Sequence, residues 1–217
     1  MDDKNFDQAT ALDWIRIIED SRANVREQDL YPLLKSWLSR SHAKNVLDIG
    51  CGQGICSVHL GETNAQYVGV DPSSDLIHRA NELYSSPSRS FATGNIYNLP
   101  FKDKSFGAAF SIAVWHLLSD ISKASSELNR VLEDKGSFLI VTADPAQYQG
   151  WMERYEKREL KASKFVGINQ SVDGSSSSDT LYLHTLDEII EALEKQSFKV
   201  STIQTVRSFV AILGQKS

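Results

Sequence analysis

An aspartate and three glycines lie close together near residue 50, in a pattern that can hold a charged cofactor. Asp48 lies in an apolar stretch, 46–49, and the run Gly50-Cys51-Gly52-Gln53-Gly54 follows directly. Glycines at a turn let the backbone adopt positive φ angles and let a ligand approach the chain closely. We therefore expect a strand over 46–49, a cofactor-binding turn over 50–54 and a helix after the turn.

The position of Asp48 discriminates among cofactors by charge. A carboxylate directed into this turn repels a pyrophosphate, whose negative charges need bare N–H groups. The third glycine of the dinucleotide fingerprint would fall at residue 55, which is Ile55. S-adenosylmethionine carries a sulfonium and an α-ammonium group and no phosphate. The pattern therefore favours S-adenosylmethionine over NAD, FAD or ATP.

Two further polar segments follow at the ends of predicted strands. Asp71 comes about 20 residues after Asp48, where a carboxylate can accept hydrogen bonds from both hydroxyls of an adenosine ribose. The Asn95 amide oxygen can accept a hydrogen bond from the adenine amino group while Ile96 stacks on the ring. Each segment alone also fits a structural role, as a helix entry or as a turn. In combination, and at these spacings, they indicate a nucleoside-binding site.

Together these residues resemble the class I S-adenosylmethionine-dependent methyltransferases, in particular those that modify small molecules. The resemblance extends from about residue 45 to the C-terminus. VLDIGCGQG is similar to motif I, VGVDPS to the ribose-binding segment and GNIYNLPFKDKSFGAAFS to the adenine segment and strand four. ELNRVLEDKGSFLIVTADP and the terminal FKVSTIQTV and RSFVAILG are similar to the later elements. The expected cofactor-binding residues are Asp48, Gly50, Cys51, Gly52, Asp71, Pro72, Asn95, Ile96 and Ser111.

The resemblance also implies a fold and a cofactor position. The fold is α/β and Rossmann-like, with a seven-stranded, mostly parallel sheet in the order 3-2-1-4-5-7-6, an antiparallel last strand and helices on both faces. S-adenosylmethionine would lie above the carboxyl ends of strands one and two, with S-adenosylhomocysteine as the product. Asn95 stands where the family most often has Asp, so an uncharged acceptor predicts weaker cofactor binding. We expect no metal ion, because the histidines show no ligand pair at helical or hairpin spacing.

Hydrophobic periodicity predicts the elements that position these residues. Short apolar strands alternate with amphipathic helices from residue 45 onward, which indicates βαβ units and a mostly parallel sheet. The expected strands are 46–49, 67–70, 90–93, 107–112, 137–142, 198–206 and 208–213, and the last two form an antiparallel hairpin. Helices are expected over 76–84, over 121–132 and from Thr185, whose spacing to Glu188 is that of a capping box.

We divide the chain into an N-terminal helical cap, 1–44, and a cofactor-binding core, 45–217. One helical stripe of the cap consists of Leu30, Leu33, Leu34, Trp37 and Leu38, and an earlier helix of Trp14, Ile17, Ile18 and Val25. Residues 145–184 are an insertion longer than ordinary loops, either a substrate lid or a tolerated surface insertion. Within it, WMERYEKRELKASKF is expected to be helical and SVDGSSSSDT to be mobile.

Methyl transfer requires a positioned acceptor and, for some acceptors, a general base. His116, in the segment SIAVWH after strand four, has a suitable ordinary pKa and is the catalytic candidate. Its structural alternative is a histidine that caps the next helix or packs on Trp115, and similar enzymes often use no base. Arg22 or Arg26 is a candidate for contact with the cofactor's carboxylate.

Composition argues against several classes of protein. The 217 residues include 23 Lys and Arg and 28 Asp and Glu, so the net charge of −5 lacks the basic excess of proteins that bind phosphate backbones. No apolar run approaches the roughly 18 residues of a membrane helix. The acidic, interrupted N-terminus predicts no signal peptide, and Cys51 and Cys56 cannot form a disulfide framework. We expect a cytoplasmic protein with a small-molecule acceptor, without membrane insertion or a nucleic-acid partner.

Three other functions stay open. The first is a methyltransferase-like protein that binds the cofactor without turnover. The second is an NAD-dependent oxidoreductase, against which the glycine spacing and Asp48 both count. The third is nucleic-acid methylation, but strand four lacks the Asn/Asp-Pro-Pro-aromatic signature of enzymes that methylate base amines.

Overall fold

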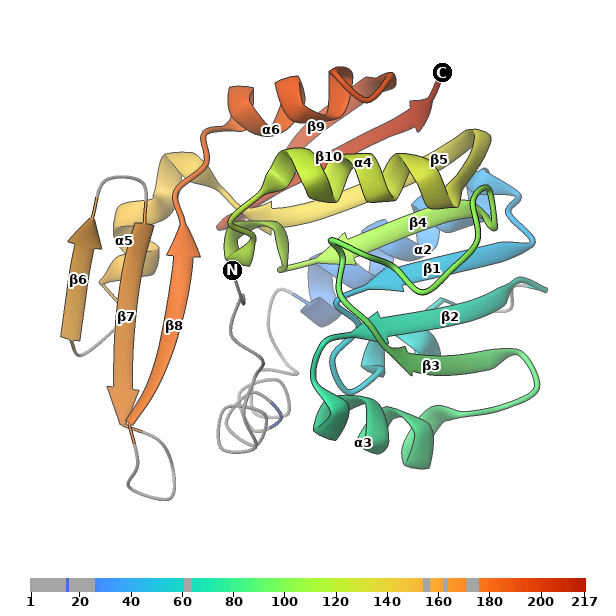
Figure 1. The fold of residues 1–217 in the computed structure, drawn as a ribbon, viewed down its shortest axis with the longest axis horizontal. Coiled ribbons are helices and arrows are strands. Elements are labelled where there is room, and N and C mark those ends of the chain that lie inside the picture. The colour runs from blue at the N-terminus through green and yellow to red at the C-terminus, as the bar shows by residue number, and fades with distance from the viewer. Residues whose placement is uncertain (1–14, 16–25, 61–63, 154–156, 162–163, 171–175) are drawn as a thin grey trace.

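The computed structural model describes residues 15, 26–60, 64–153, 157–161, 164–170 and 176–217. A seven-stranded sheet, in the order β3-β2-β1-β4-β5-β10-β9, forms its centre (Figure 1). The strands are β1 (Asn45–Ile49), β2 (Gln66–Asp71), β3 (Arg89–Thr93), β4 (Phe106–Ile112), β5 (Leu132–Ala143), β9 (Phe198–Val206) and β10 (Phe209–Lys216). Counted within this sheet alone, the order is 3-2-1-4-5-7-6, and β10 is antiparallel to both neighbours. The predicted Rossmann-like α/β fold is confirmed.

The sequences of the central strands follow from their burial. β1 and β4 are covered on both faces, which explains why they are almost continuously apolar. β1 runs parallel to both β2 and β4, with Asp48 in register with Gly69 on one side and Phe110 on the other. The carboxyl ends of these three strands therefore meet at one edge of the sheet, where the glycine turn begins.

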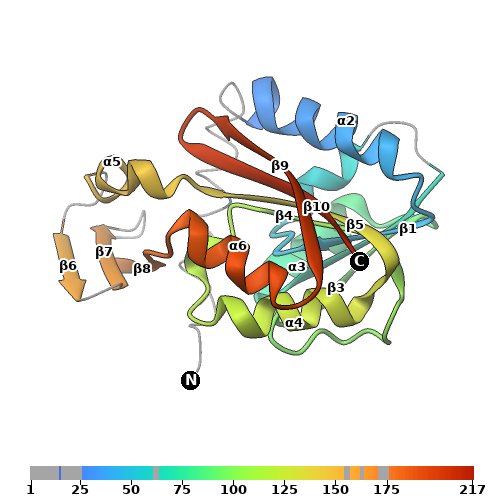
Figure 2. The same cartoon turned by 90° about the horizontal axis from the view of Figure 1, so that it is seen from above.

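Helices cover both faces of the sheet, as Figure 2 shows for α2 on one side and for α4 and α6 on the other. The helices are α2 (Tyr31–Ser41), α3 (Ser74–Tyr84), α4 (Ile121–Val131) and α6 (Leu186–Glu194). α2 and α3 share one buried cluster, whereas α4 and α6 share the other. The capping box at Thr185 and Glu188 is present as predicted. No helix within the described part of the chain is long and apolar enough to cross a membrane.

The N-terminal region is described from Arg26. A π-helical turn, Arg26–Leu30, precedes α2, which buries Leu34, Trp37 and Leu38 against the sheet as the stripe predicted. The helix expected around Trp14, Ile17, Ile18 and Val25 lies outside the described residues. The division into a 1–44 cap and a 45–217 core stays a prediction.

The helix expected after the glycine turn was a wrong prediction. The chain forms only a short 3-10 helix, Ile55–Val58, after Gly54. Gly54 and Gly61 enclose just six residues, and two of these, Ile55 and Val58, are β-branched. So short a segment cannot offset the cost of nucleating a regular helix.

The helix expected over most of WMERYEKRELKASKF was also a wrong prediction, whereas the choice between a substrate lid and a tolerated insertion stays a prediction. After the 3-10 turn Pro145–Gln147 and the short α5 (Tyr148–Met152), the chain forms a separate antiparallel sheet. Its strands are β6 (Lys157–Lys161), β7 (Lys164–Gln170) and β8 (Ser176–Tyr182). Phe165 and Gly167 are buried while Lys164 is exposed, a period-two pattern that the helix-favouring Glu, Lys and Arg residues obscured. Of SVDGSSSSDT, which was expected to be mobile, residues 171–175 lie outside the described residues, and the rest belongs to β8, which pairs along β7.

Candidate functional site

A cavity lies at the carboxyl ends of β1, β2 and β4, beside the glycine turn. It encloses about 850 Å³ of space, part of which is open to solvent. Apolar side chains form most of its walls, from Ile49 and Val70 at the strand ends to Leu117 and Leu118 before α4. Asp71 and Asn95 supply its polar side chains. An apolar cavity with a few fixed polar groups is the usual form of a cofactor site.

The glycine turn is held tightly between two neighbours. Gly50 has a φ of 76°, and its N–H donates to the Val70 carbonyl at 2.7 Å. A Cβ atom at Gly50 would lie 2.3 Å from Val114 Cγ2, so a side chain at this position cannot fit without moving Val114. Glycine is therefore required here both for the backbone conformation and for the close approach.

Asp71 is a buried carboxylate with two fixed hydrogen bonds. Its Oδ2 accepts from the Gly52 N–H and its Oδ1 from the Ser73 N–H, each at 2.9 Å. Burial raises the pKa of Asp71 to about 6, against the lowering effect of these two bonds. Each carboxylate oxygen keeps capacity for a second hydrogen bond. This is the acceptor set that two vicinal ribose hydroxyls require.

The segment after β3 also contributes to the lining of the cavity. Gly94, Asn95 and Ile96 all line it. The Asn95 Oδ1 atom accepts a hydrogen bond from the Tyr97 N–H at 2.9 Å, which fixes the amide in a local turn. An apolar side chain and a fixed amide beside each other can flank a purine ring and one of its polar edges.

A smaller cavity adjoins the first through Gly50, Gly52 and Ile112. Its lining includes opposite charges, Arg26 and Asp48. The Gln53 side chain also lines it, and the buried Gln53 Oε1 has no hydrogen-bond partner among the described residues. A buried acceptor without a partner is costly, so this atom marks a place for a ligand donor.

Asp48 is almost fully buried and accepts a hydrogen bond from the Tyr67 hydroxyl at 2.6 Å. Burial raises the pKa of Asp48 to about 7, while the Tyr67 hydrogen bond and the nearby Arg26 charge lower it. The cavity therefore offers a carboxylate and a guanidinium to a ligand that carries both an ammonium and a carboxylate.

Comparison with known proteins agrees with this geometry. Residues 47–140 match the family described as "Methyltransferase domain". The chain is 35% identical over 104 residues to a fatty-acid O-methyltransferase of Mycolicibacterium smegmatis, an alignment that covers 47% of this chain and 38% of the relative. The chain spans about half the length of the curated relatives it matches.

Residues 47–140 thus match a methyltransferase domain, and the site has the features of class I S-adenosylmethionine-dependent methyltransferases. Two solved structures share the fold of this chain. The PH0226 protein of Pyrococcus horikoshii OT3 superposes with a TM-score of 0.74 at 21% identity, covering 94% of this chain and 92% of that one. An S-adenosylmethionine-dependent methyltransferase of Clostridium acetobutylicum superposes with a TM-score of 0.73 at 12% identity, covering 94% and 99%.

S-adenosylmethionine is the cofactor of this methyltransferase domain, and the two adjoining cavities fit its two halves. The first offers apolar walls and paired acceptors to an uncharged nucleoside, and the second offers both charges to an amino acid. Among the described residues that line them, the two cavities present no cluster of cations of the kind that diphosphates require. Among the described residues, no group of three His, Cys, Asp or Glu side chains is placed to hold a metal ion.

The methyltransferase fold brings most of the predicted cofactor residues to these cavities. The first cavity is lined by Gly50, Gly52, Asp71, Pro72, Asn95 and Ile96. Asp48 and Cys51 line the second. Ser111 lies on β4 and lines neither, because its neighbour Ile112 takes the cavity side and successive strand residues face opposite ways.

The sequence analysis did not predict two residues of the site, Tyr67 and Gln53. Tyr67 reaches Asp48 because β2 pairs with β1, with Tyr67 opposite Val46 and the small Gly69 opposite Asp48. Such a diagonal contact depends on strand register, which no local pattern reveals. Gln53 gave no signal either, since the middle of a glycine turn accepts many residue types. Arg26, named as a candidate, does line the second cavity, whereas Arg22 lies outside the described residues.

The structure places His116 behind the cavity wall. It is 6% exposed, and it lines neither cavity, although its neighbours Leu117 and Leu118 line the first. The His116 Nδ1 accepts from the Ala143 N–H at 3.2 Å, so the neutral ring carries its proton on Nε2. Burial lowers the pKa of His116 to about 4. In this state Nδ1 accepts from the backbone and Nε2 holds the proton, so the ring is not arranged to take a proton from an acceptor.

Proposed function

We propose that this protein transfers the methyl group of S-adenosylmethionine to a small-molecule acceptor by in-line displacement. The observation that carries the proposal is the pair of adjoining cavities, one fitted to a nucleoside and one to a zwitterion. Asp71 supplies the paired acceptors in the first, and Arg26 with Asp48 supplies the opposite charges in the second. The glycine turn joins the two at the point where a sulfonium would bridge them.

We assign the residues as follows. Asp71 accepts hydrogen bonds from the ribose hydroxyls, and Ile96 and Asn95 flank the adenine. Asp48 and the Gln53 Oε1 accept from the α-ammonium group, and Arg26 donates to the carboxylate. The charge complementarity orients the ligand in one direction only, because the reverse orientation would place an ammonium beside Arg26.

The bound cofactor supplies an electrophilic methyl carbon, so the chain's main tasks are binding, orientation and exclusion of water. Val114, Leu117 and Leu118 form an apolar part of the lining of the nucleoside cavity. Gly50 lets Val114 pack directly on the turn. These residues restrict the space through which an acceptor reaches the methyl group.

The acceptor side is formed, in this proposal, by the inserted sheet. Figure 1 shows β6, β7 and β8 beyond the carboxyl ends of β4 and β5. The His184 Nε2 donates to the Leu118 carbonyl at 2.7 Å, and the Tyr148 hydroxyl donates to the His184 carbonyl at 2.9 Å. The insertion is thus bonded to a residue that lines the cofactor cavity. One relative with this domain is named for methylation of fatty acids, which favours an acceptor with an apolar body.

Thermal shift followed by a product screen tests the proposal. S-adenosylmethionine and S-adenosylhomocysteine should each raise the melting temperature, and NADH should not. A panel of metabolites, incubated with S-adenosylmethionine and assayed for S-adenosylhomocysteine, should then reveal the acceptor. Stabilisation by NADH alone would favour an oxidoreductase, and binding of S-adenosylhomocysteine without turnover on any acceptor would favour a cofactor-binding protein.

A further inference from the structure

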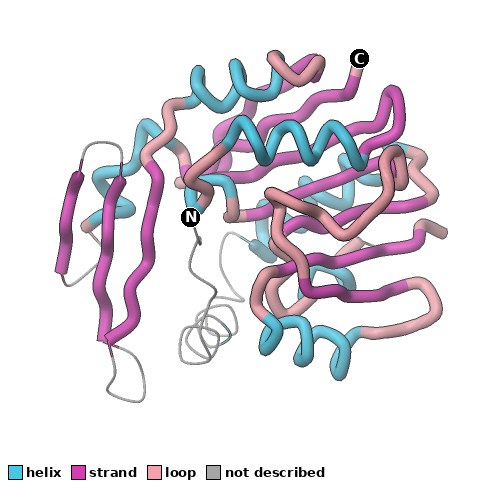
Figure 3. The backbone as a smooth tube through the Cα atoms, viewed as in Figure 1, coloured by secondary structure: helices cyan, strands magenta, loops and turns pink. Residues whose placement is uncertain are grey.

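The segment 94–105, which we name the adenine loop, runs from β3 to β4 with no regular secondary structure (Figure 3). Gly94, Asn95 and Ile96 at its start line the nucleoside cavity. Its internal hydrogen bonds are few: the Asn98 N–H donates to the Asn95 carbonyl at 3.0 Å, the Tyr97 N–H to the Asn95 Oδ1 at 2.9 Å and the Ser105 hydroxyl to the Lys102 carbonyl at 2.7 Å. A loop of this kind needs partners outside itself to hold one conformation.

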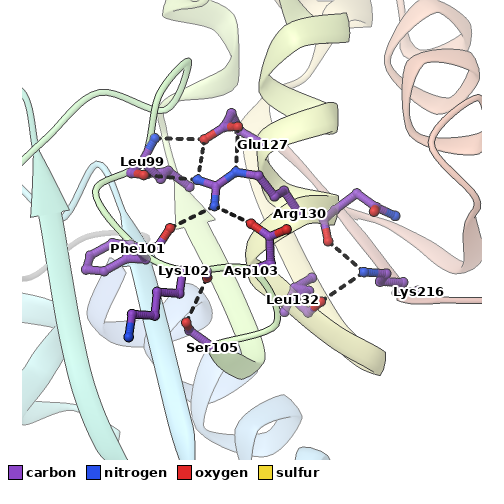
Figure 4. Close-up of polar contacts among 10 residues, drawn as sticks. Leu99, Phe101, Lys102, Asp103, Ser105, Glu127, Arg130, Leu132 and Lys216 are labelled. Carbon is purple, nitrogen blue, oxygen red and sulfur yellow. Dashed lines mark hydrogen bonds and ion pairs between the residues drawn. The ribbon is translucent and has the colours of Figure 1, made fainter.

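Arg130 on α4 holds the far part of the adenine loop. Figure 4 shows its guanidinium pointing into the loop, where it donates to the Phe101 carbonyl at 2.7 Å and to the Leu99 carbonyl at 3.0 Å. It also donates to Asp103 Oδ1 at 2.9 Å. Three groups of one irregular segment are thus fixed by a single planar side chain.

Glu127, one turn earlier on α4, completes this arrangement. Its carboxylate accepts two bonds from Arg130, from Nε and Nη2, at 2.8 Å each. It also accepts from the Leu99 N–H at 2.8 Å, so the N–H and the carbonyl of one loop residue are both held by the pair. The hydrogen bonds from Arg130 lower the pKa of Glu127, so the carboxylate stays ionised.

Tyr97 connects the same helix to the cavity-lining end of the loop. Its hydroxyl accepts from the Asp120 N–H at 3.2 Å, at the N-terminus of α4. Its own backbone N–H donates to the Asn95 Oδ1. The adenine loop is therefore tied to α4 near both ends, and one of these ties passes directly to Asn95.

Arg130 and Glu127 hold the adenine loop more firmly than an ordinary surface ion pair would. Exposed pairs contribute little to stability, and Lys104 with Asp134, at 2.6 Å, is such a pair that joins side chains only. Arg130 and Glu127 are less exposed and bind three backbone groups of the adenine loop. Their geometry therefore fixes where the loop lies, and with it the positions of Asn95 and Ile96.

We propose that Glu127 and Arg130 are positioning residues that set the preference of the cofactor site for adenine. They touch no cofactor themselves. By fixing the adenine loop they hold the Asn95 amide at the distance and angle that distinguish an amino group from a carbonyl on the purine. This inference rests on the proposed binding of S-adenosylmethionine.

Calorimetry with two ligands tests it. S-adenosylhomocysteine and S-inosylhomocysteine differ only at purine position 6 and N1, where an amino group beside an acceptor nitrogen becomes a carbonyl beside an N–H, so the ratio of their dissociation constants reports adenine recognition. We expect Arg130→Gln and Glu127→Gln each to weaken S-adenosylhomocysteine binding about tenfold and to bring the ratio towards one. Lys104→Met, which breaks an ion pair outside the network, should leave both constants unchanged.

Hydrogen exchange gives a second measurement on the same proteins. Amides of residues 95–101 should exchange faster in Arg130→Gln, with the core strands unchanged. A lower melting temperature with an unchanged ratio of dissociation constants would show a purely structural role and overturn the inference. If the wild-type protein binds neither ligand, the proposed function fails, whereas a wild-type preference that survives both substitutions overturns only this inference.

Discussion

The Tyr67 hydroxyl donates a 2.6 Å hydrogen bond to the Asp48 carboxylate beneath the glycine turn. Both side chains are buried, and they come from neighbouring parallel strands. We expected the Asp48 carboxylate to face the positive charge of S-adenosylmethionine. The neutral Tyr67 hydroxyl therefore holds this carboxylate in place by a hydrogen bond. The charge of the carboxylate depends on pH near neutrality, because burial raises the pKa of Asp48 to about 7.

Cofactor affinity should fall as the pH drops through about 7. An ammonium group beside Asp48 favours the ionised carboxylate, so below its pKa binding requires release of a proton. We expect the dissociation constant of S-adenosylhomocysteine to rise by up to about tenfold per pH unit below this point. Asp71, whose pKa is raised to about 6, should add a second rise at lower pH. Calorimetry between about pH 8 and about pH 5.5 measures both.

A ligand without the amino-acid tail provides the matched control. 5′-Methylthioadenosine has no ammonium group, so its affinity should stay level until Asp71 begins to gain a proton. Asp48→Asn should remove the step near pH 7 for S-adenosylhomocysteine. A dissociation constant for the wild type that does not change between about pH 8 and about pH 6 would contradict the assignment of Asp48 to the ammonium group.

Tyr67→Phe should move the pH step upward. The Tyr67 hydrogen bond lowers the pKa of Asp48, against the raising effect of burial. Loss of this hydrogen bond should therefore raise the pKa of Asp48 further. We expect the dissociation constant of S-adenosylhomocysteine at about pH 7 to rise three- to tenfold, about the contribution of one such bond. The aromatic ring, which packs edge-on against Phe91 at 5.6 Å, is retained. Tyr84→Phe, outside both cavities, is the control, and equal effects of the two substitutions would rule out this role.

Asp71→Ala should abolish most of the thermal stabilisation by S-adenosylhomocysteine. The substitution removes both acceptors assigned to the ribose, and we expect the dissociation constant to rise about 100-fold. It also removes the partners of the Gly52 and Ser73 N–H groups, so the melting temperature without ligand must be recorded. Asp75→Ala, in the exposed first turn of α3, is the matched control. The assignment is wrong if calorimetry finds the same affinity as in the wild type.

His116→Ala should destabilise the protein without weakening cofactor binding. The Ala143 N–H would lose its acceptor inside the core, which costs about 1–3 kcal/mol. We expect a melting temperature lower by several degrees and an unchanged affinity for S-adenosylhomocysteine. Once an acceptor is known, single-turnover rates decide between the two roles. A large loss of rate in a variant of normal stability would establish His116 as a base.

Much of the fold follows from local patterns, because burial on a sheet or helix face leaves a period in the sequence. The strand order was expected from the resemblance to the methyltransferases, and the places of Gly52 and Asp71 follow from parallel strands whose carboxyl ends meet. Contacts between residues far apart in the sequence leave no periodic pattern and could not be predicted. His116 is a buried histidine because β5 supplies the Ala143 N–H, and Tyr67 joins the site through strand register. The inserted sheet was missed because charged residues concealed its alternation.

The inserted sheet adds no strand to the central sheet. The chain leaves the central sheet after β5 and returns to it at Thr185, before α6. Under the proposed function, the part of the chain that binds the cofactor and the part assigned to the acceptor are therefore separate structural units. The inserted segment can therefore be exchanged as a unit, provided that each replacement restores a hydrogen bond to the Leu118 carbonyl like that of His184. A chimaera with the corresponding segment of a related enzyme should keep its affinity for S-adenosylmethionine and take on the acceptor specificity of that enzyme.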